Sequence, residues 1–163
     1  MSKALISLFI FLGLFASFYP VSLVEAAEKG MPKPQAKDKC PVCGMFVAKY
    51  PDWISAVVFK DGSRAFFDGT KDMFKYLFDL KRYTPLKKKE DIEGIWVLDY
   101  YALSPIPAQK AWFVAGSDVY GPMGRELIPL GKESGAKEFF QDHKGQKIIK
   151  FFEVTPEIIK ALD

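Results

Sequence analysis

The sequence predicts an α+β fold of two similar ββαβ halves, in which antiparallel sheets carry their helices on one face. The first observation is a turn signal, Asp61-Gly62, between two apolar and β-branched runs, which indicates a hairpin. The second is a pair of later stretches with apolar residues at helical spacing, each of which precedes another strand-like run. Because the elements follow one another in the same order twice, we expect two copies of one small unit.

The first half is expected to run strand, strand, helix, strand. Its hairpin strands cover 54–60 and 64–68, its helix covers 70–82, and a strand over 94–103 completes it. Thr70 lies where its side chain can cap the start of the helix. This half therefore has a local sequence signal for each of its elements.

The second half repeats this order with a loop inserted between its first two strands. Its expected elements are strands over 111–116 and 126–130, a helix over 132–144 and a strand over 146–154. The inserted segment, 118–126, contains two glycines and a proline, so we expect an irregular loop there. Gly145 is expected to stop the helix, and a last short helix is expected to begin after Thr155.

The folded part is expected to be one domain over 39–163, with halves at about 39–103 and 104–163. Between the halves, the proline-containing stretch 104–109 is expected to break the strand that precedes it. Residues 27–38 are polar and contain two prolines and a glycine, which predicts a flexible linker ahead of the domain.

The N-terminal residues 1–26 are typical of a secretory signal peptide, with a short basic start and a long apolar run. Small residues at Val24 and Ala26 predict cleavage before Ala27, and hence a periplasmic protein. The alternative is that 4–24 remains as a membrane anchor, since this run nearly reaches the ~20 apolar residues that a spanning helix needs. Contact with the membrane is expected only in that second case.

Charge and motifs exclude several classes of function. The formal net charge is only +3 and is evenly spread, so we expect no nucleic-acid partner, and the basic run 81–91 is interpreted as a solvated loop. No phosphate-binding glycine loop, Ser/His/Asp set or zinc-protease motif occurs, so we expect no enzyme. Acidic residues such as Asp61 and Asp68 flank turns, and Asp72 falls in the first turn of a helix, where local structure explains them.

Cys40 and Cys43 are the only cysteines, and their spacing alone leaves several interpretations open. They could form a disulfide, a redox pair, half of a zinc site or a soft-metal site. A closed zinc site would need a carboxylate as well, because the chain adds only one histidine, His143. A redox pair is expected at a helix N-terminus after a strand, and the residues around these cysteines do not predict that context.

Two methionines favour the soft-metal interpretation. Met45 follows Cys43 at a spacing of two, which would place thioether and thiolate on one face of an extended segment, with Gly44 allowing a tight turn. Met123 lies between Pro122 and Gly124, a poor setting for a core residue. Thiolate and thioether ligands together select Cu(I). The alternative for both methionines is simple apolar packing.

These motifs resemble those of the NosL family, exported copper-binding accessory proteins associated with nitrous oxide reductase. The resemblance rests on "CGMFVAKYPDWISAVVFKDGSRAFFDGTKDMFKYL", "VAGSDVYGPMGRELIPL" and "EFFQDHKG", and it extends over 40–154. It implies one Cu(I) bound by Cys43 and Met123, with Met45 nearby. It also implies a fold of two similar ββαβ halves.

The chain departs from the family pattern at two places. It has no lipid-accepting cysteine near the signal segment, and it has an additional cysteine, Cys40, which could supply a second thiolate. The resulting "CPVCGM" also resembles the start of YHS-type heavy-metal modules, but "AFFDGTKDMF" stands in place of their later cysteine pair. His143 is expected near the end of the second helix, as a surface group or as a further copper ligand.

The sequence thus predicts an exported copper(I)-binding protein that carries copper to a periplasmic cuproprotein. Nitrous oxide reductase is the recipient that the resemblance suggests, and a copper-supplying membrane protein is the expected donor. The alternatives are a thiol–disulfide oxidoreductase that uses Cys40 and Cys43, and a structural module with a local disulfide between them. Met123 discriminates, because only the copper hypothesis needs it.

Overall fold

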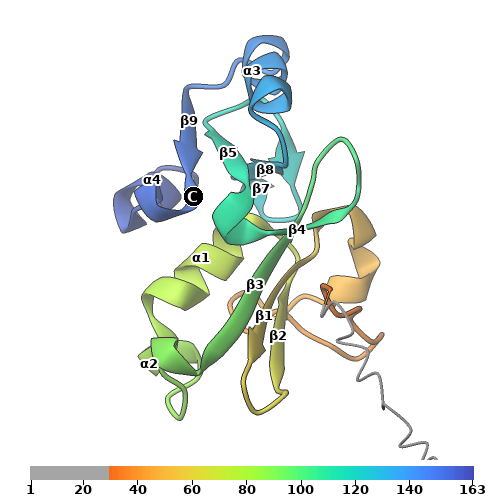
Figure 1. Ribbon diagram of the computed structural model, residues 1–163, viewed down its shortest axis with the longest axis vertical. Coiled ribbons are helices and arrows are strands. Elements are labelled where there is room, and N and C mark those ends of the chain that lie inside the picture. The colour runs from red at the N-terminus through yellow and green to blue at the C-terminus, as the bar shows by residue number, and fades with distance from the viewer. Residues whose placement is uncertain (1–29) are drawn as a thin grey trace, which may run out of the picture.

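The computed structural model describes residues 30–163. The predicted signal peptide, its cleavage point and the alternative anchor lie outside these residues. Two antiparallel sheets and the helices that pack on them are arranged end to end along the long axis, with α3 (Glu133–Asp142) at one end and the hairpin of β1 (Ser55–Phe59) and β2 (Arg64–Phe67) at the other (Figure 1). Within the described part, no helix combines the length and the apolar character needed to cross a membrane.

The first sheet has the strand order β2-β1-β3-β4. Its elements are β1 (Ser55–Phe59), β2 (Arg64–Phe67), α1 (Thr70–Phe78), α2 (Leu80–Tyr83), β3 (Ile92–Leu98) and β4 (Pro105–Pro107). The predicted hairpin is confirmed, with Ser55 opposite Phe67 and Val58 opposite Arg64. Gly62 takes a φ of 81° in its turn, a conformation that glycine adopts readily.

The second sheet has the strand order β8-β5-β9. Its elements are β5 (Trp112–Ala115), β8 (Ile128–Leu130), α3 (Glu133–Asp142) and β9 (Lys147–Lys150), and α4 (Pro156–Lys160) follows. In both sheets the first strand is central, the second pairs on one side, and the strand after the helix pairs on the other. The prediction of two ββαβ halves is therefore confirmed.

Short elements connect these units. The 3-10 helices are η1 (Val47–Lys49), η2 (Pro51–Trp53), η3 (Lys89–Asp91), η4 (Ala108–Lys110) and η5 (Phe151–Glu153). Strands β6 (Tyr120–Gly121) and β7 (Gly124–Arg125) form a two-stranded hairpin. This hairpin occupies the segment 118–126, which was expected to be an irregular loop, so that prediction is wrong.

Prolines explain a second difference from the predicted elements. The stretch 104–109 does not only break the chain, because Pro105–Pro107 forms β4 and pairs with the end of β3. An edge strand tolerates proline, since one side of it needs no N–H donors. The first sheet consequently extends beyond residue 103, the predicted boundary between the halves.

Helix ends also differ from the predictions. Thr70 is the first residue of α1, not its cap, and its hydroxyl lies 3.3 Å from that of Ser55. At the end of α3, Lys144 adopts the left-handed conformation with a φ of 53°, while the Gly145 N–H bonds to the carbonyl of Phe140 at 2.8 Å. Gly145 is needed for space instead, because an added Cβ would lie 2.7 Å from Val114.

The start of α1 is held by a side chain from the second half. The buried Glu126 carboxylate accepts the Lys71 N–H at 2.5 Å and the Leu127 N–H at 2.9 Å. It thereby satisfies a backbone donor that no residue of the helix itself can satisfy. Burial raises the pKa of Glu126 to about 8, although these two backbone hydrogen bonds and the charge of Lys71 act in the opposite direction.

The two halves share one apolar core. The Phe74 ring from α1 lies 5.5 Å from Phe113 of β5 and 5.2 Å from Phe151 of η5, measured between ring centroids. Helix α4 packs beside α1 (Figure 1). The Tyr100 N–H, which follows β3, donates to the carbonyl of Pro129 in β8 at 3.0 Å. These contacts fix the second half against the start and the buried face of α1.

The described part of the expected linker contacts the domain. Met31 packs against the main core, and Asp38 accepts the Gln35 N–H at 2.7 Å. The Val47 N–H bonds to the Asp38 carbonyl at 3.0 Å, and Lys39 pairs with Phe46 in a short antiparallel bridge. The chain is therefore already fastened to the domain before the first cysteine.

Two glycine substitutions test the role of Glu126. An added Cβ at Gly69 would collide with the Glu126 carboxylate, so Gly69→Ala should displace this carboxylate from α1 and destabilise the protein by ~1–3 kcal/mol. Gly135→Ala is the matched control. Gly135 lies within α3, and an added Cβ there would meet only the Leu130 side chain, at an ordinary contact distance of 3.7 Å. This substitution should stabilise by ~0.5–1 kcal/mol. Urea unfolding measures the change in the free energy of unfolding for both variants. Equal changes would contradict the role of the Glu126 carboxylate at the start of α1.

Candidate metal centre

The segment from Cys40 to Met45 is a tight loop. The Cys40 N–H donates to the Met45 carbonyl at 2.9 Å, and the Gly44 N–H donates to the Cys40 carbonyl at 2.9 Å. Gly44 has a φ of 81°, which a residue with a side chain rarely adopts. The expected tight turn is therefore present, and it brings the two cysteines to one side of the loop. Both cysteines are free thiols.

Each thiol lies against a buried carboxylate. The Cys40 Sγ is 3.4 Å from Asp72 Oδ2, and the Cys43 Sγ is 3.2 Å from Asp68 Oδ1. One ligand atom from each of these four residues lies within 4.8 Å of the others. Asp68 is 1% exposed, Asp72 is 3% exposed and Cys40 is 1% exposed, while Cys43 is half-buried. We call these four residues the thiol–carboxylate cluster.

The carboxylates of the cluster come from one end of α1. Asp68 precedes the helix, and Asp72 lies in its first turn. Both face the cysteine loop, because Asp68 contacts the Cys43 sulfur and Asp72 contacts the Cys40 sulfur. The stretch that stands in place of the second cysteine pair of the YHS-type modules thus supplies carboxylates instead. The prediction that local turn and helix chemistry accounts for these aspartates missed this role.

Both thiols are held in their protonated form. Burial raises the pKa of Cys43 to about 11, opposed by the N–H of Met45 and assisted by Asp68. Burial likewise raises the pKa of Cys40 far above its ordinary value, opposed by the N–H groups of Cys43 and Val42. A protonated thiol is a poor nucleophile, and the N–H groups that face the sulfurs are suited to stabilise the thiolates once a metal displaces the protons.

Met45 belongs to the same loop but not in the expected conformation. The segment from Cys43 to Met45 is not extended, because Gly44 turns the chain between them. The argument that places both side chains on one face of a strand therefore does not apply. Met45 is half-buried, and its backbone contacts both cysteines through its N–H and its carbonyl.

Met123 lies at the tip of the β6–β7 hairpin. Met123 is 42% exposed, and the following Gly124 has a φ of 86°, which closes the turn. The Met123 carbonyl accepts a hydrogen bond of 2.9 Å from the buried Lys71 ammonium group. The cysteine loop and the Met123 hairpin therefore both contact residues 68–72, at the start of α1.

His143 lies in the second half, at the end of α3. Its ring stacks on Phe139 with centroids 4.4 Å apart, and Nδ1 lies 3.4 Å from Asp118 Oδ1. Its carbonyl also accepts the Asp118 N–H at 3.0 Å. These contacts hold His143 among residues of its own half, and it is not among the donors that approach the two cysteines.

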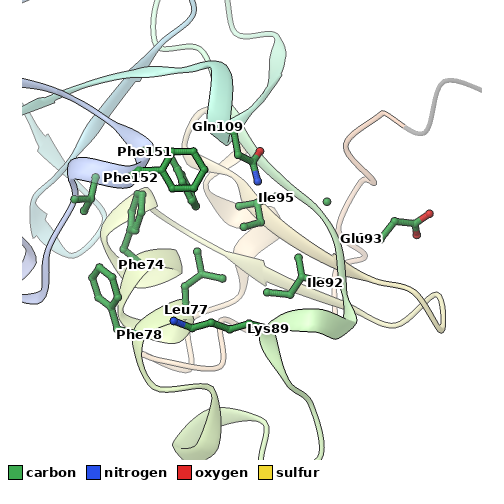
Figure 2. Close-up of a pocket in the computed structure, with 12 residues that line it drawn as sticks. Phe74, Leu77, Phe78, Lys89, Ile92, Glu93, Ile95, Gln109, Phe151 and Phe152 are labelled. Atoms are coloured by element: carbon green, nitrogen blue, oxygen red, sulfur yellow. The ribbon is translucent and has the colours of Figure 1, made fainter.

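A separate apolar groove lies along the later turns of α1 (Figure 2). It has a volume of about 460 Å³ and is bordered by Phe74, Leu77, Phe78, Ile95 and Phe151. Its lining includes neither cysteine nor methionine. The candidate sulfur ligands therefore lie outside this groove.

The chain is similar to solved structures of known proteins. The chain is similar to the crystal structure of the copper chaperone NosL from Shewanella denitrificans, with a TM-score of 0.66 and 25% identity over 79% of this chain and 98% of that chain. A second similar structure is the solution structure of the apo-NosL protein from Achromobacter cycloclastes, with a TM-score of 0.46 and 21% identity over 64% of this chain and 87% of that chain.

No curated protein matches the chain. The model of the NosL family, however, matches residues 32–159. That range contains both sheets, the cysteine loop and the Met123 hairpin. The chain therefore belongs to the NosL family.

Proposed function

We propose that this protein binds Cu(I) outside the cytoplasm and carries it to a recipient cuproprotein. The observation that supports this most directly is that two segments with sulfur residues are held at the same helix start: the half-buried Cys43 thiol contacts Asp68, and the carbonyl of the exposed Met123 contacts Lys71. Thiolate and thioether are the ligands that favour Cu(I) over harder cations. The similar protein from Shewanella is itself described as a copper chaperone, which agrees with this proposal.

Cys43 and Met123 would be the main ligands, with Met45 as a neighbouring thioether. Cys40 would be a secondary thiol, because it is almost fully buried, and His143 would have no direct role from its position on α3. Transfer would proceed by ligand exchange. A recipient sulfur or imidazole would bind copper on the exposed Met123 side and displace one ligand at a time, so no substrate is turned over.

The arrangement argues against the oxidoreductase alternative. A dithiol catalyst needs a thiol whose pKa is lowered, so that the thiolate attacks a disulfide at neutral pH. Burial instead raises the pKa values of both cysteines, and for Cys43 this value is about 11. The cysteines also lie in a turn and not at the beginning of their own helix. Metal binding explains why the loop keeps N–H donors directed at the sulfurs.

The predicted partners follow from this role. A copper-supplying membrane protein would load the site, and a periplasmic cuproprotein would receive the ion. The family resemblance favours nitrous oxide reductase as that recipient. The predicted export by residues 1–26 would place the site in the compartment where such exchange occurs.

Substitution of individual sulfurs should separate their roles. The wild type should bind one Cu(I) per chain, much more tightly than Zn(II), in competition with a colorimetric Cu(I) chelator. Cys43→Ser should weaken binding by more than about 100-fold and Met123→Leu by about tenfold or more, because even indirect ligand contacts contribute about 10–100-fold. Cys40→Ser should weaken it by less than about tenfold.

The control for the methionine test is Met31→Leu, the same change at a half-buried methionine that packs on the core. It should leave copper affinity unchanged, and each Leu variant should lose less than about 1.5 kcal/mol of stability. Normal copper binding by Met123→Leu, or displacement of copper by an equal amount of zinc, would refute the proposed site.

Copper affinity should rise with pH. Below pH 11 the Cys43 thiol is protonated in the copper-free protein, because burial raises its pKa to about 11. Cu(I) must therefore displace one proton, and affinity should increase about tenfold per pH unit through the neutral range. Chelator competition at several pH values measures this slope. A slope of about a hundredfold per pH unit would show that both thiols ligate, contrary to a single-thiolate site.

Export should produce a mature protein that begins at Ala27. The expectation rests on the small residues Val24 and Ala26 at the end of the apolar run. Mass spectrometry of the intact protein recovered from the native cell envelope should give the mass of residues 27–163. A mass that includes residues 1–26 would indicate the anchored form instead.

A further inference from the structure

The thiol–carboxylate cluster has the spacing of a four-ligand metal site. Four ligands arranged tetrahedrally at ~2.0–2.3 Å from an ion lie roughly 3.3–3.8 Å from one another. The Cys43–Asp68 and Cys40–Asp72 pairs are already at 3.2 Å and 3.4 Å, and all four donor atoms lie within 4.8 Å. Only modest side-chain movement would bring the whole set to coordination distance.

The four donors of the cluster are not the set that Cu(I) prefers. Cu(I) favours sulfur ligands, whereas a mixture of thiolate and carboxylate suits a borderline dication such as Zn(II). The proposed copper site uses Cys43 and Met123 and leaves Asp68 and Asp72 without a ligand role. Both carboxylates are almost fully buried, at 1% and 3% exposed, and each has a thiol as its hydrogen-bond donor, a proton that a dication would displace.

The surroundings orient these donors. The Oδ2 atom of Asp72 faces Cys40, while its Oδ1 atom lies 3.9 Å from the Lys75 ammonium group. N–H groups of Val42 and Cys43 face the Cys40 sulfur, and that of Met45 faces the Cys43 sulfur. Hydrogen bonds to the ligands themselves are a common feature of metal sites, because they fix orientation.

From this geometry we propose that Cys40, Cys43, Asp68 and Asp72 form a binding site for a borderline divalent transition metal of the Zn(II) class. The site would take the dication through the half-buried Cys43, since the other three donors are almost fully covered. It does not rest on the copper proposal. The two sites nevertheless share Cys43, so copper and the dication would compete for one thiolate.

The test uses Co(II) as a spectroscopic substitute for Zn(II). Reduced, metal-free protein titrated with Co(II) should bind one ion and develop the visible absorption of a tetrahedral ion, together with sulfur-to-cobalt charge transfer. Zn(II) should displace it, and one equivalent of Cu(I) should remove the signal through Cys43. Absence of a charge-transfer band, or an octahedral spectrum, would overturn the proposal.

Variants assign the ligands and separate the two proposals. Asp68→Asn, Asp72→Asn and Cys40→Ser should each weaken Co(II) binding by at least about tenfold, while copper affinity falls much less. Met123→Leu should show the opposite pattern. Asp52→Asn, an exposed aspartate in η2, is the control and should change neither.

Three outcomes decide between the possibilities. Loss of Co(II) with copper binding retained in the aspartate variants supports the dication site, and retained copper binding also shows that the variants fold. Co(II) binding unchanged in these variants would mean that the carboxylates serve only as hydrogen-bond acceptors for the thiols. If the aspartate variants do not fold, Cys40→Ser decides, since its Co(II) affinity should fall while its copper affinity is largely kept.

Discussion

The first turn of α1 has backbone donors that no residue of its own half caps, and the fold depends on how they are satisfied. The carboxylate that accepts the Lys71 N–H belongs to Glu126, 55 residues later in the chain. The Lys71 side chain in turn donates to the carbonyls of Met123 and Leu162. One helical turn therefore fastens the start of β8, the Met123 hairpin and the residues after α4 to the first half. The same turn carries Asp72, which faces Cys40. The positions of the metal-binding candidates thus follow from the way this helix begins.

Elements with a strong local signal were predictable from the sequence. The Asp61-Gly62 turn and the helical spacing of apolar residues in α1 and α3 correspond to real elements, because local propensity and tertiary packing favour the same structure there. Strand β4 and the β6–β7 hairpin were not predicted. Both consist of two or three residues rich in proline or glycine, and they are stabilised by pairing partners that local patterns do not reveal.

Of the candidate site residues, the sequence identified only those that contain sulfur and His143. Cysteine and methionine are rare enough that Cys43, Met45 and Met123 attract attention without any structure. Asp68 and Asp72 do not, since an aspartate beside a turn or in the first turn of a helix has a sufficient local explanation. Their second role depends on a loop 25 or 32 residues earlier folding back onto the helix start. The role of Glu126 could not be predicted from the sequence for the same reason, because only the tertiary structure brings it to the Lys71 N–H.

The difference in exposure across the site also bears on how fast an ion can leave, apart from how tightly it is held. Met123 is 42% exposed at a hairpin tip, whereas Cys40 is 1% exposed behind the cysteine loop. A ligand at the surface can be replaced by an incoming group without movement of the backbone. A ligand behind the loop can be replaced only when the loop opens, which requires the hydrogen bond from the Cys40 N–H to the Met45 carbonyl and that from the Gly44 N–H to the Cys40 carbonyl to break. An ion held on the outer side would therefore be kinetically labile, and one held on the inner side would be long-lived, even if their equilibrium constants were the same.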